Sequence, residues 1–230
     1  MGDRPGLLFD MDGLLLDTEQ IGLAAFQEVL ADYDVADTEA QRVYQHLVGG
    51  SNATTETRLA RHFPQIDPKT LQTRWVGAFE TRIARGVPAK PTVTATIHAL
   101  HAQGYAMAVV TSSSRVHAEH NLAAAGLLEL FQGIVPGDEV ARAKPDPLPY
   151  EQGAALLGRA AAQCVAFEDS DPGVHAATAA GCRTFQIPDI RPPDKPLPEL
   201  GQTVAQTLAD AVAQAGLLAP ASDQTAFCPL

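Results

Sequence analysis

Short apolar runs that alternate with segments of helical length constrain the fold of this chain more than any other feature. The runs cover residues 6–10, 106–111, 133–135, 164–168 and 183–187. Their length and composition predict buried strands. Helix-like stretches occupy residues 92–103, 115–125, 147–157 and 172–180. This alternation predicts an α/β fold, in which a doubly wound, mostly parallel sheet is covered by helices on both faces.

Glycine and proline residues mark the ends of these helices. Gly104, Gly126, Gly158 and Gly181 each follow a helix-like stretch, at the position where a left-handed C-terminal cap favours glycine. Pro172 suits the first turn of a helix, where the missing backbone N–H has no cost. The positions of these residues therefore support the predicted helix boundaries.

A second pattern interrupts the alternation between residues 17 and 89. Apolar residues recur there at helical spacing, as at Ile21, Ala25 and Val29. We therefore predict an inserted α-helical cap domain at residues 17–89 and an α/β core made of residues 1–16 and 90–230. Within the core, the proline-rich residues 187–198 predict a loop, and the alanine-rich residues 204–217 predict a closing helix.

Composition excludes several classes of protein. The chain has 230 residues, of which 46% are hydrophobic, and no apolar run approaches the roughly 20 residues that a membrane helix requires. Its formal net charge of −11 opposes binding to nucleic-acid polymers. Three widely spaced cysteines without a CxxC pair predict neither disulfides nor a thiolate zinc site. We expect a cytoplasmic protein without a membrane segment, and no protein partner is evident.

Polar residues gather where the predicted strands end. Asp10 ends the first strand, Thr111 and Ser112 end the second, and Glu168 and Asp169 end a later one. In an open α/β sheet, ligands bind outside the carboxyl ends of the strands. Asp12 and the loop residue Lys144 add to this set, which predicts an acidic Mg²⁺ site with hydroxyl and ammonium ligands for phosphate.

Four segments in this order resemble the motifs of the haloacid dehalogenase-like (HAD) superfamily, in its phosphatase and phosphomutase branch with a helical cap. They are LLFDMDGLLLDTE, VVTSSS, KPDPLPY and FEDSDPGVHAATAAG, and the resemblance spans nearly the whole chain. The resemblance implies a Rossmann-like core whose strands present the site, with a cap that excludes water during the reaction.

The resemblance also implies roles for individual residues. Asp10 would be the nucleophile and would form an aspartyl-phosphate, while Asp12 would act as general acid and base. Ser112 and Lys144 would bind phosphate, with Thr111 as the alternative to Ser112. Asp10, Asp12, Glu168 and Asp169 would bind Mg²⁺, with Asp12 contributing its backbone carbonyl.

Differences from the patterns of the branches separate the possible reactions. Asp12 opposes dehalogenation, because halide departure needs no proton. The β-phosphoglucomutase-like pattern has a cap histidine and a cap arginine where this chain has Gly22 and Asn52. We therefore expect a phosphatase acting on a small phosphorylated metabolite, such as a sugar or polyol phosphate. A phosphosugar mutase is the alternative, with Arg58 or Arg82 replacing the missing cap group.

Less specific signals leave further expectations. Gly49, Ser51 and Asn52 in a glycine-containing cap loop, and Arg115 after the second motif, are candidates for substrate contact. A receiver-like signalling domain is a remote alternative, which the helical insertion and the placement of the acids oppose. Histidine pairs at residues 98 and 101 and at 117 and 120 permit zinc binding, but the absence of further ligands favours exposed helix faces.

Overall fold

The computed structural model describes residues 4–47, 52–191 and 196–218. Within these ranges, parallel strands form a single sheet in the order β3-β2-β1-β4-β5-β6. The strands are β1 (Gly6–Phe9), β2 (Met107–Val110), β3 (Ile134–Val135), β4 (Cys164–Glu168), β5 (Arg183–Gln186) and β6 (Thr203–Val204). The predicted α/β fold with a parallel sheet is confirmed.

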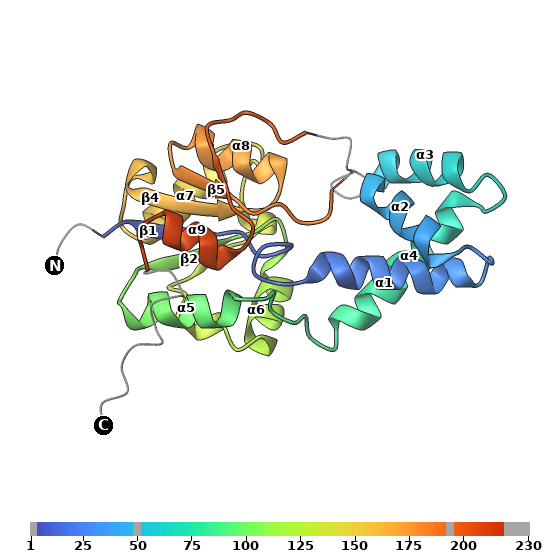
Figure 1. Cartoon of the computed structure of the whole chain (residues 1–230), viewed down its shortest axis with the longest axis horizontal. Coiled ribbons are helices and arrows are strands. Elements are labelled where there is room, and N and C mark those ends of the chain that lie inside the picture. The colour runs from blue at the N-terminus through green and yellow to red at the C-terminus, as the bar shows by residue number, and fades with distance from the viewer. Residues whose placement is uncertain (1–3, 48–51, 192–195, 219–230) are drawn as a thin grey trace, which may run out of the picture. The chain divides into compact units, whose positions relative to one another are not determined.

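Helices cover both faces of this sheet (Figure 1). They are α5 (Val93–Ala102), α6 (Arg115–Ala124), α7 (Leu148–Leu156), α8 (Asp171–Ala179) and α9 (Leu208–Gln214). Short 3-10 helices occur at η1 (Leu128–Leu130), η2 (Gly137–Glu139) and η3 (Ala161–Gln163). Helices α7 and α8 lie on one face, and α5 and α6 on the other, where α9 packs against α5. This arrangement is the doubly wound one that the sequence predicts.

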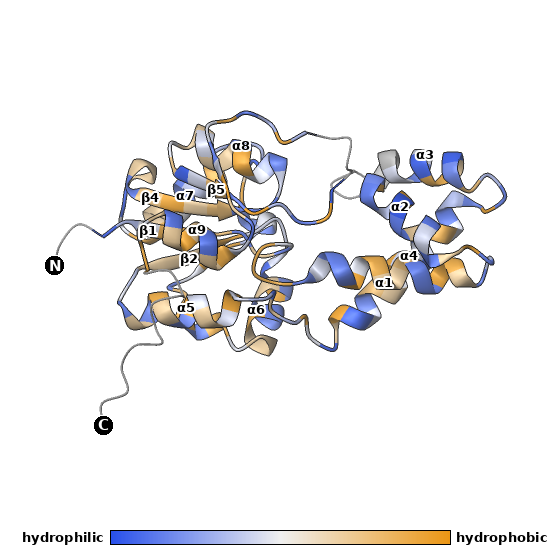
Figure 2. Ribbon diagram, viewed as in Figure 1, coloured by the Kyte–Doolittle hydropathy of each residue, from blue (hydrophilic) through white to orange (hydrophobic). Residues whose placement is uncertain are grey.

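The apolar runs form the core because their strands are buried on both faces. Every residue of β1, β2 and β4 is buried. On one face Phe9 stacks on Phe167 with 5.0 Å between ring centroids, and Phe167 stacks on Phe185. On the opposite face Leu8 and Ala166 pack with α7 and α8. Figure 2 shows the strands as predominantly hydrophobic and the outer helix surfaces as more hydrophilic.

The C-terminal part of the core differs from the prediction. Residue 204 belongs to the short edge strand β6, and α9 begins only at Leu208. Thr207 fixes this start, because its hydroxyl accepts a hydrogen bond from the backbone N–H of Asp210. Alanine content indicated a helix here, but the capping threonine decides where the helix begins.

The chain divides into two compact units. One contains Met1–Leu16, Pro88–Asp189 and Leu197–Leu230, and the other contains Asp17–Val87 and Ile190–Pro196. The predicted cap ends at residue 89, whereas the first segment of the helical unit ends at Val87, two residues earlier. The second unit also includes a short piece of the proline-rich loop.

The second unit is helical among its described residues. It contains α1 (Thr18–Ala31), α2 (Asp37–Leu47), α3 (Asn52–His62) and α4 (Pro68–Ile83). Phe26 lies at the centre of its own apolar core, with Trp75, Tyr44 and Phe63 around it. Ile190 packs against the same core. No described helix of either unit combines the length and apolar character needed to cross a membrane.

Candidate functional site

The direction of the connections reverses between β1 and β4, which are neighbours in the sheet. From β1 the chain proceeds outward to β2 and β3, whereas from β4 it proceeds to β5 on the other side. Such a switch point leaves room beyond the carboxyl ends of the two strands. Asp10 follows β1 directly, Glu168 is the last residue of β4, and Asp169 follows it.

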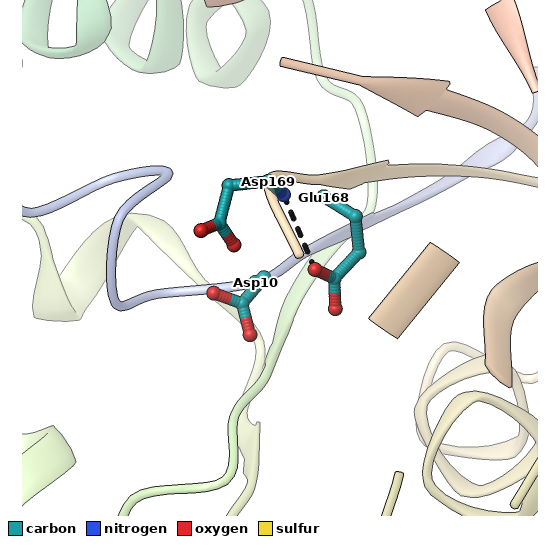
Figure 3. Close-up of side chains that lie close together, drawn as sticks. All are labelled: Asp10, Glu168 and Asp169. Carbon is teal, nitrogen blue, oxygen red and sulfur yellow. Dashed lines mark hydrogen bonds between the residues drawn. The ribbon is translucent and has the colours of Figure 1, made fainter. Parts of the chain in front are cut away.

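Carboxylate oxygens of Asp10, Glu168 and Asp169 lie within 4.8 Å of one another (Figure 3). Asp10 is only 6% exposed and Glu168 is fully buried. The backbone of Asp169 is fixed on two sides, because its N–H donates to Glu168 Oε2 and its carbonyl accepts from Gln186 Nε2. The sheet therefore holds an acidic group whose geometry suits a cation.

Lys144 joins these acids from the loop that precedes α7. Its Nζ lies 2.6 Å from Asp10 Oδ1, 2.6 Å from Glu168 Oε1 and 2.9 Å from the carbonyl of Val110. Burial by itself would lower the pKa of Lys144, but the charges of Asp10 and Glu168 outweigh it and raise the pKa above its ordinary value. Lys144 is therefore a fixed positive charge at the edge of the site.

The carboxylate of Glu168 is fully engaged by protein donors. Oε1 accepts from Lys144 and, over 2.7 Å, from the hydroxyl of Tyr150. Oε2 accepts from the backbone N–H groups of Asp169 and Ser170 and from the Ser170 hydroxyl. These contacts favour a role in orienting Lys144 over direct metal binding, so Glu168 as a metal ligand stays a prediction.

Two hydroxyl groups after β2 hold Asp12. Thr111 Oγ1 donates to Asp12 Oδ2 over 3.2 Å, and Ser113 Oγ donates to the same oxygen over 2.8 Å. The backbone N–H of Ser113 donates in turn to Thr111 Oγ1, so the two residues form one unit. Ser112 is exposed, and within the described chain its hydroxyl makes none of these bonds. The structure thus brings Thr111 to the acids and leaves the role of Ser112 a prediction.

The charges of the site do not balance. Among the described residues, the carboxylates of Asp10, Glu168 and Asp169 gather beside the ammonium of Lys144, and the negative charge of Asp12 also acts on Asp10. Burial raises the pKa of Asp10, and the charges of Glu168 and Asp12 raise it further against the opposing effect of Lys144. Burial and the charges of Asp10 and Glu168 likewise raise the pKa of Asp169. An oxygen-rich site with this excess of negative charge fits a divalent cation such as Mg²⁺.

Two glycines allow the backbone to pass close to the acids. Gly13 has φ +82°, and a Cβ there would stand 2.5 Å from Asp169 Oδ2. Gly173, in the first turn of α8, leaves a space that the Glu168 carboxylate fills, so a Cβ there would overlap it. Glycine is therefore required at both positions, for the turn after β1 and for the approach of α8 to the site.

The remaining sequence candidates have different outcomes. Gly49 and Ser51 lie outside the described residues, and Asn52 is described only as the start of α3. Arg115 forms ion pairs with Glu139 and Glu119, and its guanidinium also donates to the carbonyl of Ile134. These contacts favour a structural role, so substrate binding by Arg115 stays a prediction.

Sequence reasoning missed several residues of the site. Ser113 was detectable in principle, because it directly follows Thr111 and Ser112 in the same motif, VVTSSS. Tyr150 carried no such signal, since only the packing of α7 against the sheet brings it to Glu168. Lys90 and Asp189 likewise meet near Gly13 through the tertiary fold: their side chains form an ion pair of 2.6 Å.

Comparison with known proteins agrees with this geometry. Residues 7–187 match the model of the family described as haloacid dehalogenase-like hydrolase. Fructose-1-phosphate phosphatase YqaB of Escherichia coli is 34% identical over 187 residues, which cover 79% of this chain and 95% of the relative. Hexitol phosphatase A of the same organism is 32% identical over 196 residues, covering 79% of this chain and 82% of the relative.

A solved structure shows the same likeness in three dimensions. The crystal structure of a HAD family hydrolase from Deinococcus radiodurans R1, with bound phosphate and sodium, matches with a TM-score of 0.78 and 30% identity. The match covers 96% of this chain and all of that one. The chain therefore belongs to the haloacid dehalogenase-like hydrolase family, and it is a phosphoric monoester hydrolase.

Proposed function

We propose that the chain is a Mg²⁺-dependent phosphatase that transfers the phosphoryl group of a small sugar or polyol phosphate to Asp10 and then to water. The observation that carries the proposal is the position of Asp10. It lies directly after β1, hydrogen-bonded to a buried lysine and within 4.8 Å of the acids after β4. A carboxylate attacking a phosphate dianion needs positive charge close to both groups, which this arrangement supplies.

Each protein group has a role that its contacts support. Asp10 attacks phosphorus, and the leaving alcohol departs on the opposite side. Lys144 neutralises charge on the phosphoryl oxygens, and Glu168 keeps its ammonium in place. Asp10, Asp169 and the backbone carbonyl of Asp12 would hold Mg²⁺, which when bound supplies further positive charge to the phosphoryl group.

Asp12 serves the proton transfers of both half-reactions. Its carboxyl group protonates the leaving oxygen in the first step and, as a carboxylate, accepts a proton from the attacking water in the second. Thr111 and Ser113 both donate to Oδ2. These bonds fix the orientation of the carboxyl group that exchanges protons in both steps.

The helical unit offers an observation that favours hydrolysis over the mutase reaction. At Gly22, where the mutase pattern has histidine, an added Cβ would overlap the hydroxyl of Tyr44. That hydroxyl donates to Glu19 over 2.8 Å, and Trp75 Nε1 donates to the carbonyl of Gly22. The volume beside Gly22 is thus filled by a packed aromatic group, and a histidine there would displace it.

The names of the relatives support the class of substrate. The two Escherichia coli proteins described above are phosphatases of fructose 1-phosphate and of hexitol phosphates. We therefore place a phosphorylated sugar or polyol first among the substrates. The helical unit is the part of the chain that we expect to select the leaving group.

The test of the nucleophile compares two substitutions of adjacent acids. Asp10→Asn should abolish Mg²⁺-dependent phosphate release and prevent any phosphoenzyme from forming. Asp12→Asn should also slow turnover, but it should let a phosphoenzyme accumulate when the leaving group is good, because hydrolysis of the intermediate lacks its base. Intact-protein mass spectrometry after rapid acid quench distinguishes the two, and normal phosphatase activity of Asp10→Asn would refute the proposal.

The test of the substrate class uses a panel of phosphorylated metabolites. Hexose phosphates, hexitol phosphates, phosphoglycolate and a sugar bisphosphate are incubated with enzyme and Mg²⁺, and products are followed by ³¹P NMR. We expect free phosphate from the sugar and polyol phosphates. An isomerised sugar phosphate that forms without phosphate release would support the mutase alternative instead.

A further inference from the structure

The ion pair of Lys90 and Asp189 lies within the core unit, close in sequence to two of the points where the chain passes between the units. Lys90 N donates to the carbonyl of Leu15, and Lys90 Nζ donates over 2.8 Å to the carbonyl of Gly13. The same ammonium lies 2.6 Å from Asp189 Oδ1. The pair thus holds the turn that follows Asp12, at a place to which the motifs of the sequence assign no role.

The second oxygen of Asp189 is the unexplained feature. Asp189 Oδ2 is buried and, within the described chain, has no hydrogen-bond partner. A buried polar atom without a partner is rare and calls for an explanation, since its desolvation is uncompensated. A simple structural ion pair with Lys90 needs only Oδ1 and gives no reason for the position of Oδ2.

The direction of this oxygen supplies the explanation. A Cβ built on Gly13 would stand 2.5 Å from Asp169 Oδ2 and 3.3 Å from Asp189 Oδ2. Both carboxylate oxygens therefore lie close to the space beside Gly13 that a Cβ would occupy. Asp189 is not a member of the acid group whose oxygens lie within 4.8 Å of one another. Asp189 is therefore close enough to accept a hydrogen bond from a water molecule bound to the metal, but too far from the acid group to bind the metal itself.

Mg²⁺ in proteins keeps several water molecules, and acceptors around the site orient them. We propose that Asp189 Oδ2 accepts a hydrogen bond from a water molecule bound to Mg²⁺, while Oδ1 pairs with Lys90. Asp189 is thus a positioning residue for the metal, and the inference rests on the proposed function. The partner missing from Oδ2 would then be this water.

The experiment compares two variants that each break the ion pair. In Asp189→Asn an oxygen remains to accept from Lys90, but the charge and one acceptor are lost. In Lys90→Met both carboxylate oxygens remain and a positive charge is removed. Mg²⁺ affinity of the metal-free protein is measured by calorimetric titration with MgCl₂ and by the rise in melting temperature with MgCl₂ concentration.

We expect Asp189→Asn to weaken Mg²⁺ binding by about tenfold or more, and Lys90→Met to leave it unchanged or to strengthen it. Equal weakening in both variants would mean that the pair acts only on the structure, and it would overturn the inference. Wild-type affinity in Asp189→Asn would overturn it too. If a single variant fails to fold, Lys90→Met/Asp189→Asn, which buries no unpaired charge, should show the weakened affinity.

The outcome for the wild-type protein separates this inference from the proposed function. Absence of Mg²⁺ binding to the wild type would contradict the proposed metal dependence and this inference together. Binding to the wild type, its loss in Asp169→Asn and its full retention in Asp189→Asn would leave the proposed function intact and overturn this inference alone.

Discussion

The hydroxyl of Tyr150 donates a 2.7 Å hydrogen bond to Glu168 Oε1, the same oxygen that accepts from Lys144. Tyr150 is fully buried, and the Lys144 ammonium lies 5.3 Å from the centre of its ring. Burial and the charge of Glu168 raise the pKa of Tyr150, so the phenol stays a proton donor. One aromatic side chain in α7 thus supports both charges of the buried pair.

Tyr150→Phe should therefore impair both stability and turnover. Removing a donor to a buried charged acceptor should lower the free energy of unfolding by about 1.5–3 kcal/mol. Because Glu168 would then hold Lys144 less firmly, kcat should fall about tenfold with a smaller change in KM. Urea denaturation and steady-state kinetics measure the two effects.

Tyr33→Phe is the matched control for this substitution. Its hydroxyl accepts a 3.3 Å hydrogen bond from Arg74 at the surface of the helical unit. The loss there should stay within about 0.5 kcal/mol, as is usual for surface substitutions. A Tyr150→Phe enzyme with the stability and kcat of the wild type would contradict the supporting role.

Gly173→Ala should be strongly destabilising although alanine favours helices. The added Cβ would overlap the carboxylate of Glu168, which five protein donors hold in place. Either α8 must move from the sheet or the carboxylate must leave its donors, and we expect a loss of about 3 kcal/mol or more. Thermal unfolding followed by circular dichroism gives the change.

Gly77→Ala provides the comparison, because Gly77 lies within α4 and a Cβ there would meet nothing within 4 Å. That substitution should stabilise the protein by about 0.5–1 kcal/mol through helix propensity alone. If the two substitutions had similar effects, the surroundings of Glu168 would be able to accommodate the added Cβ, and the rigid arrangement of its donors would be contradicted.

The hydroxyls of Ser112 and Ser113, which follow β2, should have different functions that single substitutions can distinguish. Ser113→Ala removes the shorter of the two hydrogen bonds to Asp12 Oδ2. Because both half-reactions use Asp12 as acid or base, kcat should fall by about tenfold. The pH profile of kcat should shift as well, since the hydroxyl stabilises the ionised form of Asp12. Kinetics between pH 5 and 9 test this expectation.

Ser112→Ala distinguishes the two readings of the second motif. If the exposed hydroxyl of Ser112 binds the phosphoryl group, its loss should raise KM and lower kcat/KM. If Thr111 alone has that role, Ser112→Ala should resemble the wild type.

For Ser113→Ala, a pH profile of kcat like that of the wild type would contradict the idea that the hydrogen bond to Asp12 determines proton transfer.

Metal-free protein should become more stable as the solution is made mildly acidic. Burial raises the pKa of Asp10, so the folded state binds a proton at a higher pH than the unfolded chain does. Between the ordinary value of 3.8 and the raised one, the folded state therefore binds more protons, and stability rises as pH falls. Melting temperatures in EDTA across this range measure the slope.

Mg²⁺ or the substitution Asp10→Asn should reduce this slope. Bound Mg²⁺ stabilises the carboxylate form in the folded state, and asparagine cannot take up the proton. Asp10→Asn should also melt at a higher temperature than the wild type in EDTA at neutral pH, because it removes a buried charge that burial and the charges of Glu168 and Asp12 together disfavour, against the attraction of Lys144. A slope that persists in Asp10→Asn would have to be assigned to another acid, such as Asp169.

The acids at the strand ends were predictable because their chemistry is local. Asp10 and Asp169 directly follow apolar runs, and a parallel sheet places all such ends at one edge. The predicted strand at residues 164–168 is the observed β4, since a run of buried apolar residues ending in an acid has clear limits. Order along the chain was therefore sufficient to assemble the carboxylates.

Other parts were not predictable, because they depend on tertiary packing. In the sequence Tyr150 resembles an ordinary core residue of a helix. Its hydroxyl reaches Glu168 only when α7 packs on the sheet. Metal binding by Glu168 stays a prediction, whereas its hydrogen bonds to Lys144 and Tyr150 are visible only in the folded structure. The edge strand β6 has two exposed residues, too few for any hydrophobic pattern.

The pairing of β1 with β4 has a consequence for the synthesis of the protein. Gly6 pairs with Cys164, so β1 acquires this neighbour only after the intervening strands β2 and β3 have been made. On the ribosome Asp10 emerges well before the acids that complete its site. A nascent chain therefore contains Asp10 but lacks the acids at the end of β4. Hydrolysis begins only once β4 has left the exit tunnel and joined the sheet.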